Sequence, residues 1–334
     1  MEKKGAIELQ FNWILVLVAG AVLLIIFIGF ISRQQEASST SDDILTASSL
    51  DTIFHIYSDA DVSDTIKISK SKISFNCDSF AVNSISKQLG GLSLFSPASL
   101  DTNKLQVMSL GWYVPYKITN FVYSTSPDAR YIFIGESDFA RKMFDKIKGK
   151  VRADGFTNTQ VIYNENNDKV RLILFGQNPE MPINLKEPDL SLSAVKIDGD
   201  ENKGVIEFFD FIDNKFEPRG KSYYIGEASL LGAVFADNIG IYSCNMEKGF
   251  NKMRILSNIY NKKIGHIIAH YNTAEGNNAC RDFYQSNLLE ILDYISYLAS
   301  LDFQSSNYES IINAVNKIEE MNNDANALSC VLIY

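Results

Sequence analysis

The 334-residue sequence is poor in the residues that most often carry chemistry, with three histidines, four cysteines and two tryptophans. No two cysteines form a C-x-x-C pair, which excludes the usual zinc-binding and dithiol redox motifs. There is no G-x-G-x-x-G and no glycine-rich loop ending in Lys-Ser or Lys-Thr, so the standard dinucleotide and P-loop signatures are missing. A G-x-S-x-G nucleophile elbow is missing as well. The sequence therefore indicates no familiar catalytic class, and we expect no cofactor.

Positive charge is the minor sign. Lys and Arg number 31 against 40 Asp and Glu, which gives a net charge of −9, and no basic cluster is interleaved with aromatic residues. Nucleic-acid binding depends on clustered cations that neutralise phosphates. We therefore expect no nucleic-acid partner.

One apolar run stands out near the start of the chain, at Phe11–Ile31. It contains no charged residue, and a helix of this length matches a hydrocarbon core of roughly 30 Å. Lys3 and Lys4 precede the run and only Arg33 follows it closely. The positive-inside rule then places residues 1–10 in the cytoplasm and the bulk of the chain outside. The expected partner of Phe11–Ile31 is the lipid bilayer, and the expected location is the cell membrane, with a single pass.

The residues before this run are also informative. Lys3-Lys4-Gly5 is followed by Ala6-Ile7-Glu8-Leu9 and then the apolar run. This pattern resembles the class III signal of type IV pilins and archaellins, and the resemblance covers about the first 30 residues. It implies that a peptidase cuts after Gly5, so that Ala6 begins the mature chain and the apolar segment stays as an anchor or filament core. Glu8 would be the third residue after the cut rather than the fifth, where Gln10 stands. An uncleaved signal anchor explains the same residues and remains the alternative.

After the anchor, the periodicity changes along the chain and predicts an α+β or α/β fold. Residues 32–63 are polar at first and then partly helical, as a juxtamembrane segment. Residues 64–243 show apolar/polar alternation and short apolar runs, which predict a mixed β-sheet domain. Residues 244–334 show helical spacing, which predicts a C-terminal helical subdomain packed on the same domain.

The middle of the chain shows a strand–helix–strand pattern, followed by further predicted strands. Ser137 is a suitable N-cap for a helix that continues to about Ile147, between apolar runs at 131–134 and 170–175. Strand, helix and strand in this order predict a βαβ-like unit. Further strands are predicted at 194–197, 205–211, 222–225, 230–235 and 239–242. Residues 330–334 are an apolar tail that we expect to be tucked into the fold as a strand.

The four cysteines, Cys77, Cys244, Cys280 and Cys330, all follow the anchor. An extracytoplasmic compartment permits disulfides. We favour Cys244 with Cys280, because a long helix and its return lie between them, and Cys77 with Cys330 as the remainder. Four buried free thiols are the alternative.

Two motifs could hold a ligand. His266 and His270 are four residues apart on a predicted helix, so both could face one metal ion, but the zincin pattern requires a glutamate where Ile267 stands. Gly135 and Ser137 stand at a strand-to-helix junction, where a helix N-terminus could meet a phosphate. Neighbouring acidic residues there would repel an anion, so an ordinary helix cap explains this junction as well.

Two further groups of residues could form a site. Carboxylates lie in or near predicted strands, where a pair could serve a hydrolase, while Ser229 has the wrong glycine offsets for a nucleophile elbow. An aromatic cluster lies around Pro115 and could be core or a binding face for a partner chain or carbohydrate. The carboxylates are Glu207, Asp210, Asp213 and Glu227, and the aromatics are Trp112, Tyr113, Tyr116, Phe121 and Tyr123.

Two functions follow from these observations. The first is a membrane-anchored cell-surface protein of structural or interaction type, pilin-like, whose partner is a second copy or another envelope protein. The second is a membrane-anchored extracytoplasmic hydrolase that uses carboxylates of the middle domain. The lack of catalytic signatures favours the first.

Overall fold

The computed structural model describes residues 40–156, 169–179, 191–213, 215–273 and 278–334. Between residues 18 and 28 it describes eight helical residues, all apolar or glycine. The predicted cleavage site at Gly5 and Ala6 and much of the predicted membrane helix at 11–31 lie outside the described residues. Within the described part of the chain, no helix combines the length and the apolar character that a membrane crossing requires.

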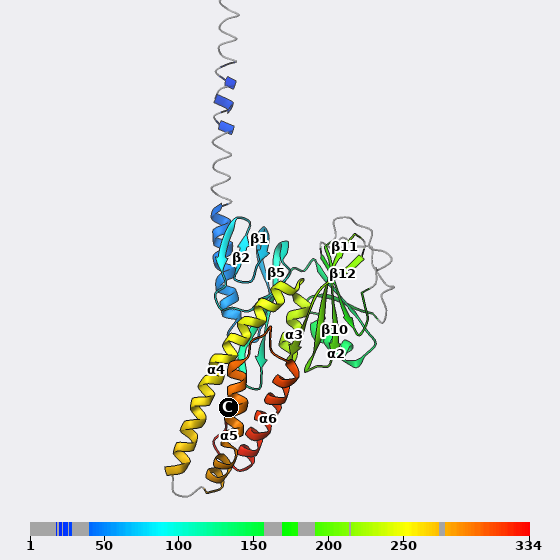
Figure 1. Ribbon diagram of the computed structural model, residues 1–334. Coiled ribbons are helices and arrows are strands. Elements are labelled where there is room, and N and C mark those ends of the chain that lie inside the picture. The colour runs from blue at the N-terminus through cyan, green and yellow to red at the C-terminus, as the bar shows by residue number, and fades with distance from the viewer. Residues whose placement is uncertain are drawn as a thin grey trace, which may run out of the picture.

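A first sheet, sheet A, follows a helix over residues 40–57 (Figure 1). Its strand order is β3-β2-β1-β5-β6-β4, and all neighbours are antiparallel except β4 and β6. The strands are β1 (Ser63–Phe75), β2 (Ser79–Val82), β3 (Ile85–Gln88), β4 (Leu94–Phe95), β5 (Ser99–Tyr113) and β6 (Lys117–Thr125).

The helix over residues 40–57 packs on one face of sheet A. Its buried residues Ala47, Leu50 and Phe54 are three and four positions apart, which places them on one side of the helix. Phe54 meets the rings of Phe75 and Phe80 at centroid distances of 6.3 and 5.3 Å. These residues belong to one apolar cluster, so the helix is fixed to the sheet by burial along its second half.

A second sheet, sheet B, has the strand order β12-β11-β10-β9-β7-β8. Strands β8, β7, β9 and β10 are parallel, and β11 and β12 continue the sheet antiparallel. The elements are β7 (Ala129–Ile134), α2 (Asp138–Ile147), β8 (Arg152–Phe156), β9 (Lys169–Phe175), β10 (Ser191–Gly199), β11 (Lys203–Ile212) and β12 (Lys215–Ile225).

The βαβ unit in sheet B is confirmed, with one correction. Ser137 caps α2 by accepting a hydrogen bond from the Ala140 backbone N–H at 3.1 Å. The strand that follows α2 is β8, whereas the apolar run at 170–175 forms β9 on the other side of β7. The sequence Arg-Ala-Asp-Gly-Phe of β8 has little apolar character, because the strand lies at the edge of the sheet.

The rest of the chain is helical, in α3 (Gly226–Phe235), α4 (Ile239–Thr273), α5 (Asn278–Ser300) and α6 (Tyr308–Ala327). The strands predicted at 194–197, 205–211 and 222–225 are confirmed, but those at 230–235 and 239–242 are wrong, since they belong to α3 and α4. Eight of the ten residues of α3 are buried, so its apolar run lacks the alternation that separates a helix from a strand. The helical region thus begins at Gly226, and the boundary expected at residue 244 falls inside α4.

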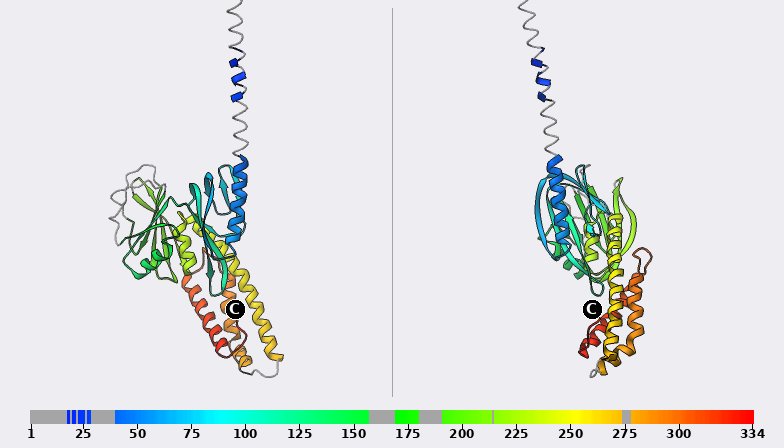
Figure 2. Two further views of the ribbon diagram at one scale, coloured as in Figure 1. Left: turned by 180° about the vertical axis from the view of Figure 1, so that it is seen from behind. Right: turned by 90° about the vertical axis from the view of Figure 1, so that its left-hand side faces the viewer.

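Helices α4, α5 and α6 form a bundle that projects beyond the two sheets (Figures 1 and 2). The tail after α6 is tucked against this bundle but forms no strand. Ile333 is fully buried, and its backbone N–H donates to the side-chain oxygen of Asn322 at 2.8 Å. The Tyr271 hydroxyl accepts from the Val331 N–H at 3.0 Å. Side chains of the bundle therefore satisfy backbone groups that a strand partner would otherwise take up.

Two disulfides join Cys77 to Cys244 and Cys280 to Cys330, with Cα–Cα distances of 5.8 and 5.5 Å. The pairing expected from the sequence is therefore wrong. Cys244 lies near the start of the 35-residue helix α4, beside sheet A, whereas Cys280 follows its far end. At a rise of about 1.5 Å per residue, the two ends of α4 are roughly 40 Å or more apart. Because α6 runs back toward that far end, Cys330 meets Cys280 there.

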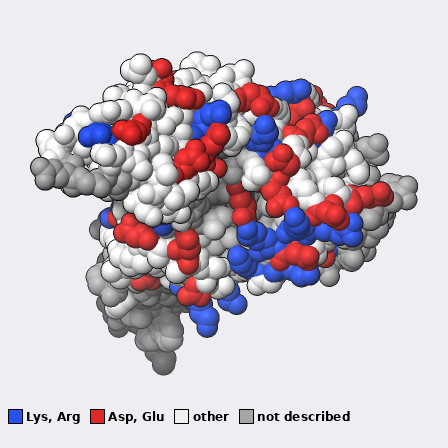
Figure 3. Space-filling view, turned by 90° about the horizontal axis from the view of Figure 1, so that it is seen from below, with Lys and Arg blue, Asp and Glu red and all other residues white. Residues whose placement is uncertain are grey.

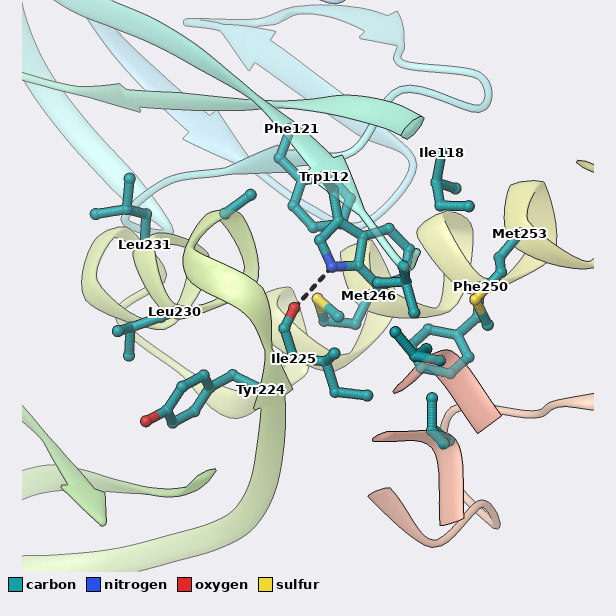
Figure 4. Close-up of a cluster of buried hydrophobic side chains, with 14 of the residues drawn as sticks. Trp112, Ile118, Phe121, Tyr224, Ile225, Leu230, Leu231, Met246, Phe250 and Met253 are labelled. Carbon is teal, nitrogen blue, oxygen red and sulfur yellow. Dashed lines mark hydrogen bonds between the residues drawn. The ribbon is translucent and has the colours of Figure 1, made fainter. Parts of the chain in front are cut away.

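One hydrophobic core joins both sheets to the helices. Figure 4 shows Trp112 of β5 at the meeting point, beside Phe121 of β6 and facing Met246 and Phe250 of α4. The indole N–H donates to the Ile225 carbonyl oxygen, which immediately precedes α3, at 2.8 Å. Trp112 thus links three parts of the fold: sheet A, the end of sheet B and the first turns of α4.

The core also contains tyrosines whose ionisation should be coupled to folding. Burial is the largest cause of a raised phenol pKa at each of them. The pKa reaches about 12 for three, Tyr116, Tyr284 and Tyr334. It is raised further for Tyr123, Tyr131, Tyr223, Tyr224 and Tyr242.

We expect cooperative unfolding in alkali for this reason. A folded-state pKa above the unfolded value gives stability that is intact below about pH 10 and is lost as the pH rises toward the folded value. Phenolate absorbance and the circular dichroism signal of the helices should therefore change together in one step above about pH 10. Gradual ionisation of the tyrosines with an unchanged helix signal would contradict the coupling.

Candidate functional site

A cavity of about 520 Å³ opens beside α2, at the carboxyl ends of β7 and β8. This is the edge of a parallel sheet at which ligands commonly bind in open α/β folds. A Cβ on Gly135 would lie 2.9 Å from the Cβ of Phe175, so the strand can turn into α2 here only without a side chain. The lining residues are Phe133, Gly135, Glu136, Ala140, Arg141, Phe144, Asp145 and Gly155.

The chemistry of this cavity does not suit an anion. Glu136 and Asp145 contribute carboxylates to its lining, and Arg141 already pairs with Asp138 at 2.8 Å. The hydroxyl of Ser137 is used by the cap of α2. Gly135 of the predicted phosphate site lines this cavity, but the carboxylates beside it would repel a phosphate. Gly135 and Ser137 therefore fit an ordinary helix start better than a phosphate site.

The histidine pair gains no third ligand from the part of the chain that the structure describes. His266 and His270 both lie on the exposed side of α4, as the spacing predicted. Among the described residues, Cys77, Asp78 and Cys244 form the one group of three potential ligands close enough to share a metal ion, and its two sulfurs are bonded to each other. Neither arrangement provides the ligands of a metal site in this form of the protein.

The candidate carboxylates do not converge. Glu207 and Asp210 of β11 are three positions apart, so they project to opposite faces of sheet B. Glu207 pairs with Lys221 at 3.6 Å and Asp210 with Arg219 at 2.7 Å. Glu227, at the start of α3, pairs with Lys146 of α2. Asp213 lies in the turn after β11 with a positive φ of 49°.

Ser229 has a structural role. It is fully buried in α3, and its hydroxyl donates to the Ile225 carbonyl oxygen at 2.7 Å and lies 2.8 Å from the Ile225 N–H. Both contacts are with the backbone that leads into the helix, so they stabilise the first turn of α3. The hydroxyl contacts no histidine, and its position offers no route for a nucleophile.

The aromatic cluster around Pro115 is mainly core. Trp112, Tyr116, Phe121 and Tyr123 are almost fully buried, and only Tyr113 is exposed, at 55%. The interpretation as a binding face is therefore wrong for four of its five members. The alternation along β5 explains the exception, because Tyr113 follows Trp112 and points to the opposite side.

Comparison with known proteins returns no match. No family model, no curated protein and no solved structure corresponds to this chain.

A polar joint at the opposite end of the parallel strands was not foreseen. Asp237, between α3 and α4, accepts a hydrogen bond from the Ala98 N–H, just before β5 of sheet A, at 3.0 Å. It also accepts one from the Lys169 ammonium of sheet B, at 2.8 Å. Next to it, the buried Arg171 guanidinium donates to the Ala233 and Val234 carbonyl oxygens, both at 2.8 Å. Arg171 within an otherwise apolar strand was the available signal. This joint holds the sheets together, and the cavity that the described residues form beside it, about 10 Å³, is too small for a ligand.

A cation-rich segment was also overlooked, in residues 141–152 of α2 and β8. Figure 3 shows Lys and Arg side chains gathered on the face seen from below, with Asp and Glu side chains close to them. Four cations of this segment have acidic partners, which neutralise them in place: Arg141 with Asp138, Lys142 with Glu201, Lys146 with Glu227 and Lys148 with Asp145. Four of its six cations are therefore paired with carboxylates, which weakens the attraction of this segment for a phosphate.

Proposed function

We propose that this protein is a membrane-anchored, extracytoplasmic structural or interaction protein of the pilin-like type. One observation carries the proposal. The described side chains of Val18, Leu23, Leu24, Ile25, Phe27 and Ile28 are each between 56% and 70% exposed. They belong to helical residues that stand clear of the folded domain (Figures 1 and 2).

The six large apolar side chains of this short helical stretch must be shielded from water by another surface. Exposed apolar surface of this extent is rare on soluble monomers and marks a contact with lipid or with another protein. At roughly 100° per residue, the eight described residues point to more than half of the helix circumference. A lipid bilayer or the core of a filament surrounds a helix in this way, whereas a groove on a partner covers one side.

The helix over residues 40–57 is the next described element after this stretch. Its inner side is buried on sheet A through Ala47, Leu50 and Phe54, while Ile44 and Leu45 remain exposed near its start. An anchor at residues 11–31 would therefore hold the domain close to the membrane through a helix that is packed on the sheet.

The outer location is supported by two independent features. Lys3 and Lys4 precede the apolar run, in keeping with the positive-inside rule. All four cysteines are paired in disulfides, which persist in oxidising compartments outside the cytoplasm. The hydrolase alternative lacks comparable support, because Glu207, Asp210 and Glu227 pair with three separate cations.

Processing at Gly5 can be tested directly. We expect the protein purified from its native membrane to begin at Ala6, as the resemblance to class III signals implies, and a Gly5→Val variant to keep Met1. N-terminal sequencing of both proteins gives the answer. The control is Gly20→Ala, since a Cβ at Gly20 would meet nothing within 4 Å. A wild-type chain that begins at Met1 yet stays in the membrane would establish the uncleaved anchor, and recovery in the soluble fraction would contradict anchoring altogether.

A further inference from the structure

The exposed side of α4 is both apolar and cationic. Ile255 and Ile259 lie one turn apart and are 62% and 54% exposed. Arg254 and Lys262 flank them on the same exposed side. Over its whole length α4 contains five Lys and Arg and a single acidic residue, Glu247. We call Arg254, Ile255, Ile259 and Lys262 the α4 stripe.

The neighbouring side of the bundle has the opposite charge. Residues 278–334 contain eight Asp and Glu against two Lys and Arg. On α5, Leu289 is 77% exposed, and Glu290 and Asp293 lie beside it on the exposed side. Asp293 has no ion-pair partner among the residues that the structure describes. We call Leu289, Glu290 and Asp293 the α5 stripe.

A groove of about 460 Å³ lies between α5 and α6, next to the α5 stripe. Tyrosine rings attract cations through their faces, and carboxylates pair with them through charge. Glu309, one of the two carboxylates of the groove, already pairs with Lys203 at 3.1 Å, while Asp293 remains open. The groove therefore has room and charge for a Lys or Arg side chain. Its lining residues are Asp293, Tyr294, Tyr297, Glu309, Ser310, Asn313 and Ala314.

We infer that the α4 stripe of one copy of this chain docks on the α5 stripe and groove of a second copy. The two stripes match in character, since each combines exposed aliphatic side chains with charges, of opposite sign in the two cases. A cation of the α4 stripe enters the groove beside Asp293, and Ile255 and Ile259 cover Leu289. The inference names the partner for the proposed assembly function and rests on that function.

Anchoring in one membrane makes a small contact sufficient. The α4 stripe runs from Arg254 to Lys262, a rise of about 12 Å, so the area buried falls below that of a stable dimer in free solution. Copies held in one bilayer with the same orientation meet at a high effective concentration, which strengthens a weak contact without adding interactions. The bundle projects from the sheets, so it is free to meet a neighbour (Figure 2).

The test uses the full chain in membranes and cysteine cross-linking between copies, since all four native cysteines are already paired. Ile259→Cys and Leu289→Cys copies, expressed together, should form an intermolecular disulfide. The yield should exceed by about tenfold that of Ile259→Cys copies alone, which report random collisions; this ratio corresponds to about 1.4 kcal/mol. It should also fall as salt is added, because the charges are exposed.

Charge reversal makes the test specific. In the copy that carries Ile259→Cys, the double change Arg254→Glu and Lys262→Glu should reduce the cross-link yield about tenfold. In the copy that carries Leu289→Cys, the double change Glu290→Lys and Asp293→Lys should then restore the yield. Lys67→Glu with Lys70→Glu, on exposed positions of β1, makes the same change of charge and should leave the yield unaltered. Equal yields for the Ile259–Leu289 and Ile259–Ile259 pairs, with the protein still in the membrane, would overturn this contact alone. Loss of the protein from the membrane fraction would instead overturn the proposed function.

Discussion

Replacing Arg171 with methionine is expected to lower the free energy of unfolding by about 3–5 kcal/mol. Arg171 lies in the middle of β9 and is 4% exposed. Its guanidinium donates to the Ala233 and Val234 carbonyl oxygens and to the Ser193 hydroxyl, at 2.8, 2.8 and 3.0 Å. Methionine fills a similar space but has no N–H group to offer.

The physical reason is the end of α3. The last carbonyl groups of a helix have no partner within the helix, and here they are buried, so water cannot replace the guanidinium. Burial lowers the Arg171 pKa to about 10, which still leaves the side chain charged at neutral pH. The positive charge lies at the negative end of the α3 dipole, where it is favourable. Removing it leaves acceptors unpaired and takes a countercharge away from Asp237.

Urea unfolding followed by circular dichroism measures the effect, with Arg219→Met as the matched control. Arg219 lies on β12, is 42% exposed and pairs with Asp210, so its loss should change stability by less than about 1 kcal/mol. Arg171→Lys should fall between the two, because one ammonium cannot reach all the acceptors that the planar guanidinium reaches. Equal stabilities for the Arg171→Met and Arg219→Met proteins would show that the capping of α3 does not hold the joint together.

The sequence predicted secondary structure well where one face of a helix or strand is buried and the other is exposed to solvent. The alternation in β1, the Ser137 cap of α2 and the helical spacing of α5 and α6 all predicted elements that the structure contains. It was uninformative where burial is complete. The apolar run of α3 has no periodicity because the helix is enclosed on nearly every side, and the edge strand β8 has too little apolar character to be noticed.

The candidate sites show a second limit. Ile259 fits the apolar spacing of α4, which alone would place it on the buried side, yet it is 54% exposed, since the bundle covers only part of that helix. The groove beside Asp293 depends on how α5 and α6 approach each other, and the disulfide pairs depend on how far α4 carries the chain. These are properties of packing between distant segments, and local spacing contains no information on them.

Replacing Trp112 with alanine is the second large effect, and we expect a loss of about 3–5 kcal/mol. Trp112 is fully buried, and its ring centroid lies 5.1 Å from that of Phe121 and 5.5 Å from that of Phe250. A Cβ on Gly249 would approach the indole to 3.1 Å, so the ring packs directly on the backbone of α4. The surrounding elements are held by two sheets and a disulfide, so they cannot collapse fully into the space that alanine leaves.

Trp112→Phe separates the packing of the ring from its hydrogen bond. Phenylalanine keeps most of the apolar contact but removes the indole donor to the Ile225 carbonyl oxygen. The Ser229 hydroxyl still donates to that oxygen, so the lost hydrogen bond should cost about 0.5–1.5 kcal/mol. Thermal unfolding followed by circular dichroism ranks the three proteins, and we expect wild type, Trp112→Phe and Trp112→Ala in order of falling stability. If Trp112→Ala proved no worse than Trp112→Phe, the hydrogen bond to Ile225 alone would account for the residue. A larger loss with alanine would instead show that the indole ring fills the space between β5, α3 and α4. The packing of this ring would then hold sheet A against the helices, and α4 and α5 are the helices that the proposed contact between copies requires.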